Sequence, residues 1–330
     1  MEAIPEKLHL LMVKQGYHFV GTHSAVKICE YTAKGLQGKT LCYKNKFYGI
    51  RSWRCLQATP AIGCDLSCRF CWRNIPEEIG ISWNELNAVK NWDDPEDIVK
   101  GMIEAQRKIV SGYKATADSK LKMQRWHEAN HPLHATLSLT GEPTFYPKLS
   151  TLIQQFHNLG MSTFLVTNGT LPEALKELNP LPTQLYISLQ APDEETYLKT
   201  TRPKINDAWK RFLEALSFMS TVKTRTVLRM TLVKGLNMLN PEGYAKLIKL
   251  ANPMYVEVKG FSYVGGSRSP ERGLSMASMP NHKEIKDFAN EITKYTGYTY
   301  TDEHELSRIV LLSRDKAASD NRIINFNDGI

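Results

Sequence analysis

The amino-acid sequence predicts an α/β fold: a partial (β/α)6 barrel of the TIM type, with an N-terminal cysteine-bearing extension and C-terminal additions. Two observations predict it. From about residue 59 onward, apolar strand-like runs alternate with amphipathic helical stretches, and this order implies parallel strands joined by helical crossovers. The runs are also rich in Val, Ile and Leu rather than cleanly alternating, as strands are when helices cover a sheet.

Six strands are predicted in this part of the chain. They lie at 58–63, 134–141, 161–169, 184–190, 226–233 and 254–261. Amphipathic stretches between them predict helices near 95–112, 147–159, 172–178, 206–219 and 241–251. A helix from about residue 281 and a strand at 307–314 follow. Six β/α units are too few to close an eight-fold barrel but enough for an open or partial one.

The chain divides into three predicted segments. Residues 1–57 form an extension that lacks the strand–helix rhythm and contains three cysteines. Residues 58–265 form the partial barrel, and residues 266–330 form a C-terminal extension. A polar, basic insertion at about 114–132 interrupts the first crossover, and its composition predicts an irregular segment.

Composition and charge narrow the class of protein. Of the 330 residues, 42% are hydrophobic and 23% are charged, as in an ordinary soluble globular protein. No run reaches the roughly 18 consecutive apolar residues of a membrane span. The first residues do not resemble a secretory signal, so we expect a cytoplasmic protein. The formal net charge of +8 favours a polyanionic partner, although the same charge is also found in chains that are merely soluble.

The cysteines are gathered in the first quarter of the chain. They are Cys29, Cys42, Cys55, Cys64, Cys68 and Cys71. In a cytosolic protein, clustered cysteines indicate metal or redox chemistry more often than disulfides. Their segregation therefore predicts a site.

The last three cysteines have the spacing C-x3-C-x2-C in the segment GCDLSCRFCW. Such a short loop can turn three thiolates toward one centre. Three ligands are one short of the four that close a structural zinc or iron site, so an iron–sulfur cluster held in this way keeps one iron open for a chelating ligand. The alternative is a zinc site completed by a fourth cysteine or histidine, but zinc modules usually pair two C-x2-C knuckles.

Polar residues stand where the predicted strands end. In a sheet or barrel of parallel strands, functional groups gather at the carboxyl ends of the strands. The residues assigned to these positions are Gly141, Glu142, Asn168, Ser188, Gln190, Arg229 and Lys259.

The cysteine loop, with Phe70 before its last cysteine, resembles the signature of the radical S-adenosylmethionine superfamily. The likeness covers roughly residues 58–265. It implies that Cys64, Cys68 and Cys71 bind a [4Fe-4S] cluster, whose fourth iron is chelated by S-adenosylmethionine before reductive cleavage to a 5′-deoxyadenosyl radical. It also implies that the TGEP segment holds the methionine amine, although Thr140 stands where the first glycine is usual. The implied cofactor-binding residues are Gly141, Glu142, Asn168, Ser188, Gln190 and Arg229.

The other three cysteines have the spacing C-x12-C-x12-C. Three buried free cysteines are one interpretation, because cysteine packs like a small hydrophobic residue. Cys29, Cys42 and Cys55 directly precede the cluster loop, however, and a second three-thiolate site would account for every cysteine. We favour a second [4Fe-4S] cluster with one iron free for a ligand.

This double pattern, followed by CWRN (71–74), is similar to the archaeal-type tRNA-wyosine (4-demethylwyosine) synthases. The similarity continues through SLTGEPTFYP, LVTNGTLP, ISLQAPDEETY and VEVKGFSYVGGSR. It implies a carbon–carbon lyase that condenses N1-methylguanosine of phenylalanine tRNA, next to the anticodon, with pyruvate to form the tricyclic base. Eukaryotic members have an added flavodoxin-like domain, so an external donor such as flavodoxin or ferredoxin is expected here, and the protein is expected to be a monomer.

The resemblance further implies a lysine that holds pyruvate as a Schiff base near the second cluster. Lysine does this when burial or neighbouring charge lowers its pKa. Lys44, two residues after Cys42, is the candidate, and Lys46 is the alternate. The ordinary alternative for either is a solvated surface charge.

A tRNA substrate requires phosphate contacts and a target base that leaves the stack. The basic insertion could grip the anticodon stem-loop or be a solvated loop. The candidate contacts are Arg73, Lys114, Lys120, Lys122, Arg125, Trp126, Arg268 and Arg272. Two other functions are kept open: another two-cluster radical enzyme acting on RNA, such as a methylthiotransferase, and a non-catalytic zinc RNA-binding protein.

Overall fold

The computed structural model describes residues 4–86, 89 and 91–326. In this part of the chain, one curved sheet has the strand order β1-β2-β3-β4-β5-β6-β7-β8-β10-β9. Its strands are β1 (His18–Val20), β2 (Ser24–Val26), β3 (Cys55–Thr59), β4 (His134–Leu137), β5 (Ser162–Thr167), β6 (Gln184–Leu189), β7 (Arg225–Leu232), β8 (Tyr255–Gly260), β9 (Thr299–His304) and β10 (Ile309–Ser313).

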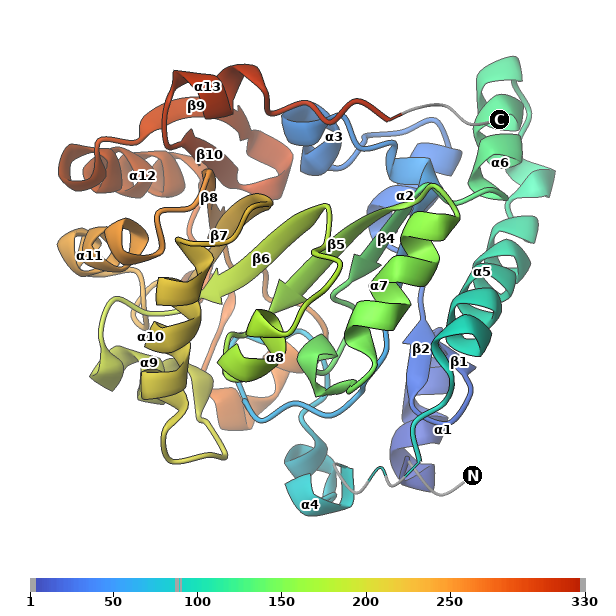
Figure 1. Cartoon of the computed structure of the whole chain (residues 1–330), viewed down its shortest axis with the longest axis horizontal. Coiled ribbons are helices and arrows are strands. Elements are labelled where there is room, and N and C mark those ends of the chain that lie inside the picture. The colour runs from blue at the N-terminus through green and yellow to red at the C-terminus, as the bar shows by residue number, and fades with distance from the viewer. Residues whose placement is uncertain (1–3, 87–88, 90, 327–330) are drawn as a thin grey trace.

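Strands β3 to β8 run parallel to one another and form the partial (β/α)6 barrel (Figure 1). Each of them overlaps its predicted segment, and the predicted fold class is confirmed. The first strand is the least accurate, because β3 begins at Cys55 and has already ended before Pro60. Proline provides no backbone donor for a strand ladder, so the apolar residues Ala61 and Ile62 continue as a loop.

Helices cover the outer face of the barrel (Figure 1). The helices are α1 (Glu6–Lys14), α2 (Glu30–Leu36), α3 (Tyr43–Tyr48), α4 (Trp83–Leu86), α5 (Pro95–Ser111), α6 (Lys120–Ala129), α7 (Leu149–Asn158), α8 (Pro172–Lys176), α9 (Glu194–Thr201), α10 (Ala208–Met219), α11 (Pro241–Ala251), α12 (His282–Thr296) and α13 (Lys316–Asp320). The main apolar core lies between these helices and the sheet, where Leu137, Leu165 and Ile187 are fully buried. Burial of such side chains stabilises each by about 1.5–3 kcal/mol. On the other face of the sheet, α3 packs Phe47 and Tyr48 against strand residues such as Tyr186.

The two terminal segments add antiparallel strands to the same sheet. The hairpin β1–β2 pairs with β3 at one edge, and β10 and β9 pair with β8 at the other. The N-terminal extension also contacts the opposite edge, since the Tyr31 hydroxyl hydrogen-bonds Ser307 at 2.7 Å and Lys46 forms an ion pair with Asp302 at 2.8 Å. The extension therefore bridges the open side of the barrel near α3.

The basic insertion is helical rather than irregular. Ser119 begins α6 by accepting a hydrogen bond from the backbone N–H of Lys122, as preferred N-cap residues do. Trp126 then packs beside the buried Val110 of α5 and donates its indole N–H to the carbonyl of that residue at 3.1 Å. This packing explains why a polar segment folds as a helix.

Within the described residues, no helix has both the length and the apolar character needed to cross a bilayer.

Candidate active site

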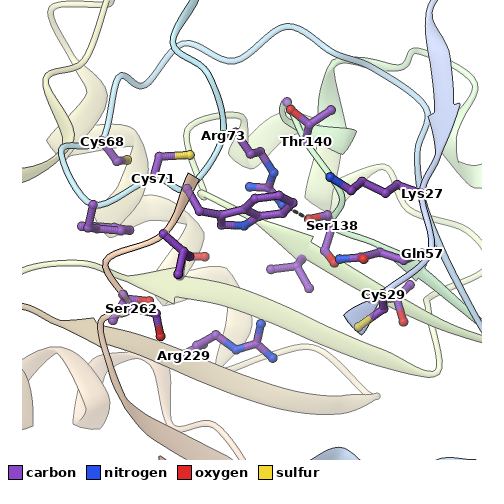
Figure 2. Close-up of a pocket in the computed structure, with 18 of the residues that line it drawn as sticks. Lys27, Cys29, Gln57, Cys68, Cys71, Arg73, Ser138, Thr140, Arg229 and Ser262 are labelled. Atoms are coloured by element: carbon purple, nitrogen blue, oxygen red, sulfur yellow. Dashed lines mark hydrogen bonds between the residues drawn. The ribbon is translucent and has the colours of Figure 1, made fainter. Parts of the chain in front are cut away.

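A cavity of about 750 Å³ occupies the inside of the barrel, and all six cysteines line it. This volume is typical of small-molecule and cofactor sites. Figure 2 shows Cys68 and Cys71 on one side of the cavity and Cys29 on another, with Arg229 below them. Below, the first trio is Cys64, Cys68 and Cys71, the second trio is Cys29, Cys42 and Cys55, and the cavity is called the central cavity.

The loop of the first trio is held on two sides by other parts of the chain. Backbone N–H groups of Ser67 and Arg69 donate to the carbonyls of Thr201 and Thr200 at 2.9 Å, which attaches the loop to the end of α9. On the other side, the buried guanidinium of Arg272 donates to the carbonyl of Cys71. A loop fixed in this way holds its thiols in place before any metal binds.

Burial and neighbouring negative charges raise the pKa of thiols in the first trio. Burial, and then the neighbouring Asp65, raise the pKa of Cys64 well above its ordinary value, and Cys68 adds to the effect. Burial and Cys71 raise the pKa of Cys68. Three neighbouring thiolates are stable together only beside a cationic centre, and a cluster of iron ions would provide that charge.

Gly141 and Glu142 lie where the resemblance predicts. Gly141 has φ of +66°, and a Cβ added there would stand 2.1 Å from the carbonyl oxygen of Ala61, so only glycine fits. The Glu142 carboxylate is buried and accepts hydrogen bonds from the backbone N–H groups of Thr144 at 3.1 Å and Asn168 at 2.8 Å. Burial raises the pKa of Glu142 to about 7.

Asn168 and Gln190 also line the central cavity, together with Ser188. The Asn168 amide donates to Asp65 at 2.9 Å and approaches the Cys64 sulfur at 3.7 Å, which joins the end of β5 to the first trio. Gln190 is 8% exposed, and its buried Oε1 has no hydrogen-bond partner among the residues that the structure describes. Because buried polar atoms are normally paired, this orphaned acceptor fits a bound ligand that donates hydrogen bonds, as the ribose and amine of S-adenosylmethionine do.

The second trio comes from three separate elements. Cys29 precedes α2, Cys42 precedes α3, and Cys55 begins β3. Burial and then Cys29 raise the pKa of Cys42 to about 12 and that of Cys55 to about 11, and Lys44 opposes each shift. The three thiols thus share one environment with the Lys44 amine in it.

The donor sets of both trios fit iron–sulfur clusters. Among the described residues, no three His, Cys, Asp or Glu side chains converge closely enough to share one metal ion. All three donors of each trio are cysteine thiols, the ligands that hold the irons of such clusters.

Lys44 is buried in the central cavity and is 9% exposed. Its Nζ lies 5.0 Å from the ring centre of Phe164 and 4.8 Å from that of Tyr186. Burial and the nearby Arg229 lower the pKa of Lys44. The alternate Lys46 has its side chain 51% exposed, pairs with Asp302 and does not line the cavity, so the geometry favours Lys44 over Lys46.

A buried carboxylate connects α3 to the barrel strands. Glu257 on β8 has no exposed side-chain surface, and the Arg229 guanidinium of β7 donates to it at 2.8 Å. The hydroxyls of Tyr43, Tyr48 and Tyr186 also donate to this carboxylate, at 3.2, 2.9 and 3.2 Å. These five residues, here called the Glu257 network, hold the helix that contains Lys44 against the inside of the sheet.

Arg229 thus has a structural partner in addition to any ligand. Its Nη2 donates to the Tyr43 hydroxyl at 2.6 Å, and its side chain still lines the central cavity. The predicted contact between Arg229 and S-adenosylmethionine stays a prediction.

Sequence reasoning missed Lys27 as a residue of the cavity. Lys27 lies over the rings of Tyr17 and Trp72, at 4.8 and 5.5 Å from their centres. Lys259, which the sequence places at a strand end without a role, lines the wall at the end of β8. Lys27 gave no such signal, since it follows a three-residue strand.

The predicted tRNA contacts differ in their exposure. Arg272 is wrong as a contact, because its side chain is fully buried and forms a bidentate ion pair with Glu78 at 2.7 and 2.8 Å. Arg73 lines the cavity, and its guanidinium donates to the carbonyls of Ser138 and Leu139 (Figure 2). None of the candidates in and before α6 lines the cavity: Lys114, Lys120, Lys122, Arg125 and Trp126. Arg268 is exposed.

Family models match nearly the whole barrel and the strands after it. The model of the radical SAM superfamily matches residues 59–248, and the model described as wyosine base formation matches residues 250–314. The first covers more than half of the chain.

Among curated proteins, the S-adenosyl-L-methionine-dependent tRNA 4-demethylwyosine synthase of Pyrococcus abyssi is 47% identical over 317 residues, covering 94% of this chain and 90% of the relative. The mouse protein of the same description is 39% identical over 95% of this chain, which spans 42% of that relative.

Two solved structures each cover 98% of this chain and 99% of their own chain. One is titled as TYW1 with a lysine-pyruvate adduct bound (TM-score 0.83, 33% identity). The other is titled as archaeal TYW1 (TM-score 0.76, 31% identity). The chain therefore belongs to the radical SAM superfamily and, within it, to the tRNA 4-demethylwyosine synthase family.

Proposed function

We propose that this protein condenses N1-methylguanosine of phenylalanine tRNA, next to the anticodon, with pyruvate, and so forms 4-demethylwyosine. The observation that most supports this reaction is the position of Lys44. Its side chain lines the central cavity, and its charge lowers the pKa of all three thiols of the second trio. The first trio lines the same cavity. A radical-generating centre and a carbonyl-binding amine are the two parts that the reaction requires.

The first trio would hold a [4Fe-4S] cluster, which supplies reductive cleavage of S-adenosylmethionine and hence hydrogen-atom abstraction when both are bound. The chain's own residues would bind and orient that cofactor. Glu142, at the end of the tight turn that Gly141 permits, would accept from the methionine amine. The Oε1 of Gln190 would accept a hydrogen bond from the cofactor. The side-chain amide of Asn168 would hold Cys64 and Asp65 in position.

The second trio would hold a second [4Fe-4S] cluster beside the pyruvate. In this arrangement the neutral amine of Lys44 attacks the keto carbon of pyruvate, and loss of water gives the Schiff base. The low pKa of Lys44, caused first by burial and then by Arg229, favours the neutral nucleophile. The rings of Phe164 and Tyr186 would shield the adduct from water.

The proposal also covers the fate of the pyruvate carbons, the electron donor and the oligomeric state. Two pyruvate carbons would close the third ring while the carboxylate carbon leaves, which makes the enzyme a carbon–carbon lyase. The electron would come from an external donor such as flavodoxin or ferredoxin, and the protein would act as a monomer. The division at residues 57 and 265 also stays a prediction, since one sheet runs through all three segments.

The target guanine would leave the anticodon stack and enter the central cavity. Arg73 lies beside the Trp72 ring, with its guanidinium carbon 5.0 Å from the ring centre, and α6 presents the exposed Lys120 next to α2. Phosphate contacts by Lys114 and Lys120 would make tRNA binding fall with salt. Replacing both by alanine should lower the slope of log affinity against log salt by about two, and an unchanged slope would exclude them.

The reaction itself is tested under anaerobic conditions with reconstituted protein, S-adenosylmethionine, a reductant and phenylalanine tRNA bearing N1-methylguanosine. Pyruvate labelled at carbons 2 and 3 should label the tricyclic nucleoside found by mass spectrometry after digestion, whereas pyruvate labelled at carbon 1 should not. A sulfur-containing nucleoside would instead indicate a methylthiotransferase. An unchanged nucleoside together with cleaved S-adenosylmethionine would exclude this substrate.

A further inference from the structure

Lys259 stands at the carboxyl end of β8, and its side chain lines the central cavity. In the sheet it is paired with Thr231 of β7 and with Ile309 of β10. Within the part of the chain that the structure describes, the Nζ atom donates hydrogen bonds only to carbonyl oxygens, those of Gly260 at 3.4 Å and Ser307 at 3.3 Å. Both distances lie beyond the usual range for a strong hydrogen bond, so the ammonium can donate further hydrogen bonds to a ligand.

The surrounding charges leave Lys259 without a carboxylate of its own. Among the described residues, no ion pair of Lys259 is formed. Glu257, two residues earlier on the same face of β8, accepts instead from Arg229 and from three tyrosine hydroxyls. Burial, Arg229 and Arg308 lower the pKa of Lys259 to about 8, against the smaller opposite effects of Cys42 and Glu257. An excess of positive charge in an enclosed wall favours an anionic ligand.

Lys259 is connected to the segment that contains the second trio. Its Nζ lies 3.3 Å from the carbonyl oxygen of Ser307, and the Ser307 hydroxyl hydrogen-bonds Tyr31, two residues after Cys29, at 2.7 Å. The neighbouring charges that shift the pKa values of both Lys259 and Lys44 include Arg229, Glu257 and Cys42. An anion at Lys259 therefore lies on the Lys44 side of the central cavity.

We propose that the Lys259 ammonium binds the carboxylate of the 2-keto acid whose keto carbon reacts with Lys44. The inference rests on the proposed function, because it presupposes that a keto acid occupies this part of the cavity. In such a substrate the carboxylate carbon is bonded directly to the keto carbon, so an amine at each end fixes both groups at once. Lys259 is then a binding residue for the substrate, and it orients the bond to the carboxylate that is later broken.

The test measures binding of labelled pyruvate to the reconstituted holoenzyme by anaerobic equilibrium dialysis, without tRNA. Wild type is compared with Lys259→Met, which removes the charge, and with Lys259→Arg, which keeps it. We expect Lys259→Met to weaken binding by about tenfold to a hundredfold, as the loss of one charge-assisted hydrogen bond does. Lys259→Arg should remain within about threefold of wild type. Circular dichroism and iron content report whether each variant is folded and loaded.

Covalent trapping of pyruvate on Lys44 with cyanoborohydride gives a second readout on the same proteins. Lys259→Met should require more pyruvate for half-maximal trapping, while methyl pyruvate, whose carboxylate is esterified, should be trapped equally by both proteins. Because Lys259 is charged only below its pKa, the advantage of wild type should shrink as the pH rises through about 8. The Arg variant, which stays charged, should keep its advantage.

Three results would overturn the inference. Equal pyruvate binding by wild type and Lys259→Met is the first. The second is weaker binding of S-adenosylmethionine with unchanged pyruvate binding, which would assign Lys259 to the methionine carboxylate. The third is weaker tRNA binding with unchanged pyruvate binding, which would assign it to a phosphate. If wild type itself binds no pyruvate, the proposed function fails, and that outcome differs from all three.

Discussion

Replacing Lys44 by methionine is expected to lower the formation of the tricyclic nucleoside by on the order of 10³-fold or more. Methionine fills a similar volume but has no amine, so the Schiff base cannot form. The first trio and the residues near Glu142 are untouched, so S-adenosylmethionine should still be cleaved by the reduced enzyme without tRNA. The measurement follows the modified nucleoside and 5′-deoxyadenosine in the same anaerobic reaction.

Lys46→Met is the matched control for this prediction. Lys46 lies on the same short helix α3, is half exposed and pairs with Asp302 at the surface. Its replacement should change product formation by less than about twofold, since exposed ion pairs contribute little. Loss of activity in Lys46→Met with retention in Lys44→Met would reverse the assignment of the two lysines.

Replacing Glu257 by alanine should destabilise the protein by about 3–5 kcal/mol, because it leaves the charge of Arg229, whose side chain is only 19% exposed, unpaired inside the barrel. The change also removes the acceptor for the hydroxyls of Tyr43, Tyr48 and Tyr186. Since Tyr43 directly precedes Lys44, α3 should lose its attachment to the barrel. Urea unfolding followed by circular dichroism measures the loss of stability, and cyanoborohydride trapping of pyruvate should decline in the same variant.

Glu291→Ala provides the comparison for this second prediction. Glu291 is an exposed residue of α12 that pairs with Lys294 at 2.5 Å on the surface. Removal of such a pair should cost less than about 1 kcal/mol. If Glu257→Ala were no more destabilising than Glu291→Ala, the Glu257 network would have no structural role.

The parallel strands can be predicted from the sequence because each is a short apolar run followed by an amphipathic helix. Strand β9 cannot, because its residues TYTDEH are mostly polar and at least partly exposed. Its pairing depends on β10, which lies later in the chain. Likewise, α6 is helical because Trp126 packs on α5, and that contact is not visible in a polar segment.

The site is predictable where local spacing determines it. The cysteine loop and the turn at Gly141 depend on neighbours within a few residues, so their patterns are visible in the sequence. Arg272 shows the opposite case, since its partner Glu78 is 194 residues away and nothing near it indicates burial. The Glu257 network also escapes prediction, because it requires the register that brings Arg229 opposite Glu257.

We expect one cavity to hold two iron–sulfur clusters, with the second trio and Lys44 forming the pyruvate side. Anaerobic iron and sulfide analysis of reconstituted protein tests this arrangement beside the triple variant Cys29→Ala, Cys42→Ala, Cys55→Ala. Wild type should contain about eight irons per chain and the variant about four. Equal iron content in the two proteins would exclude the arrangement, because the second trio would then bind no cluster.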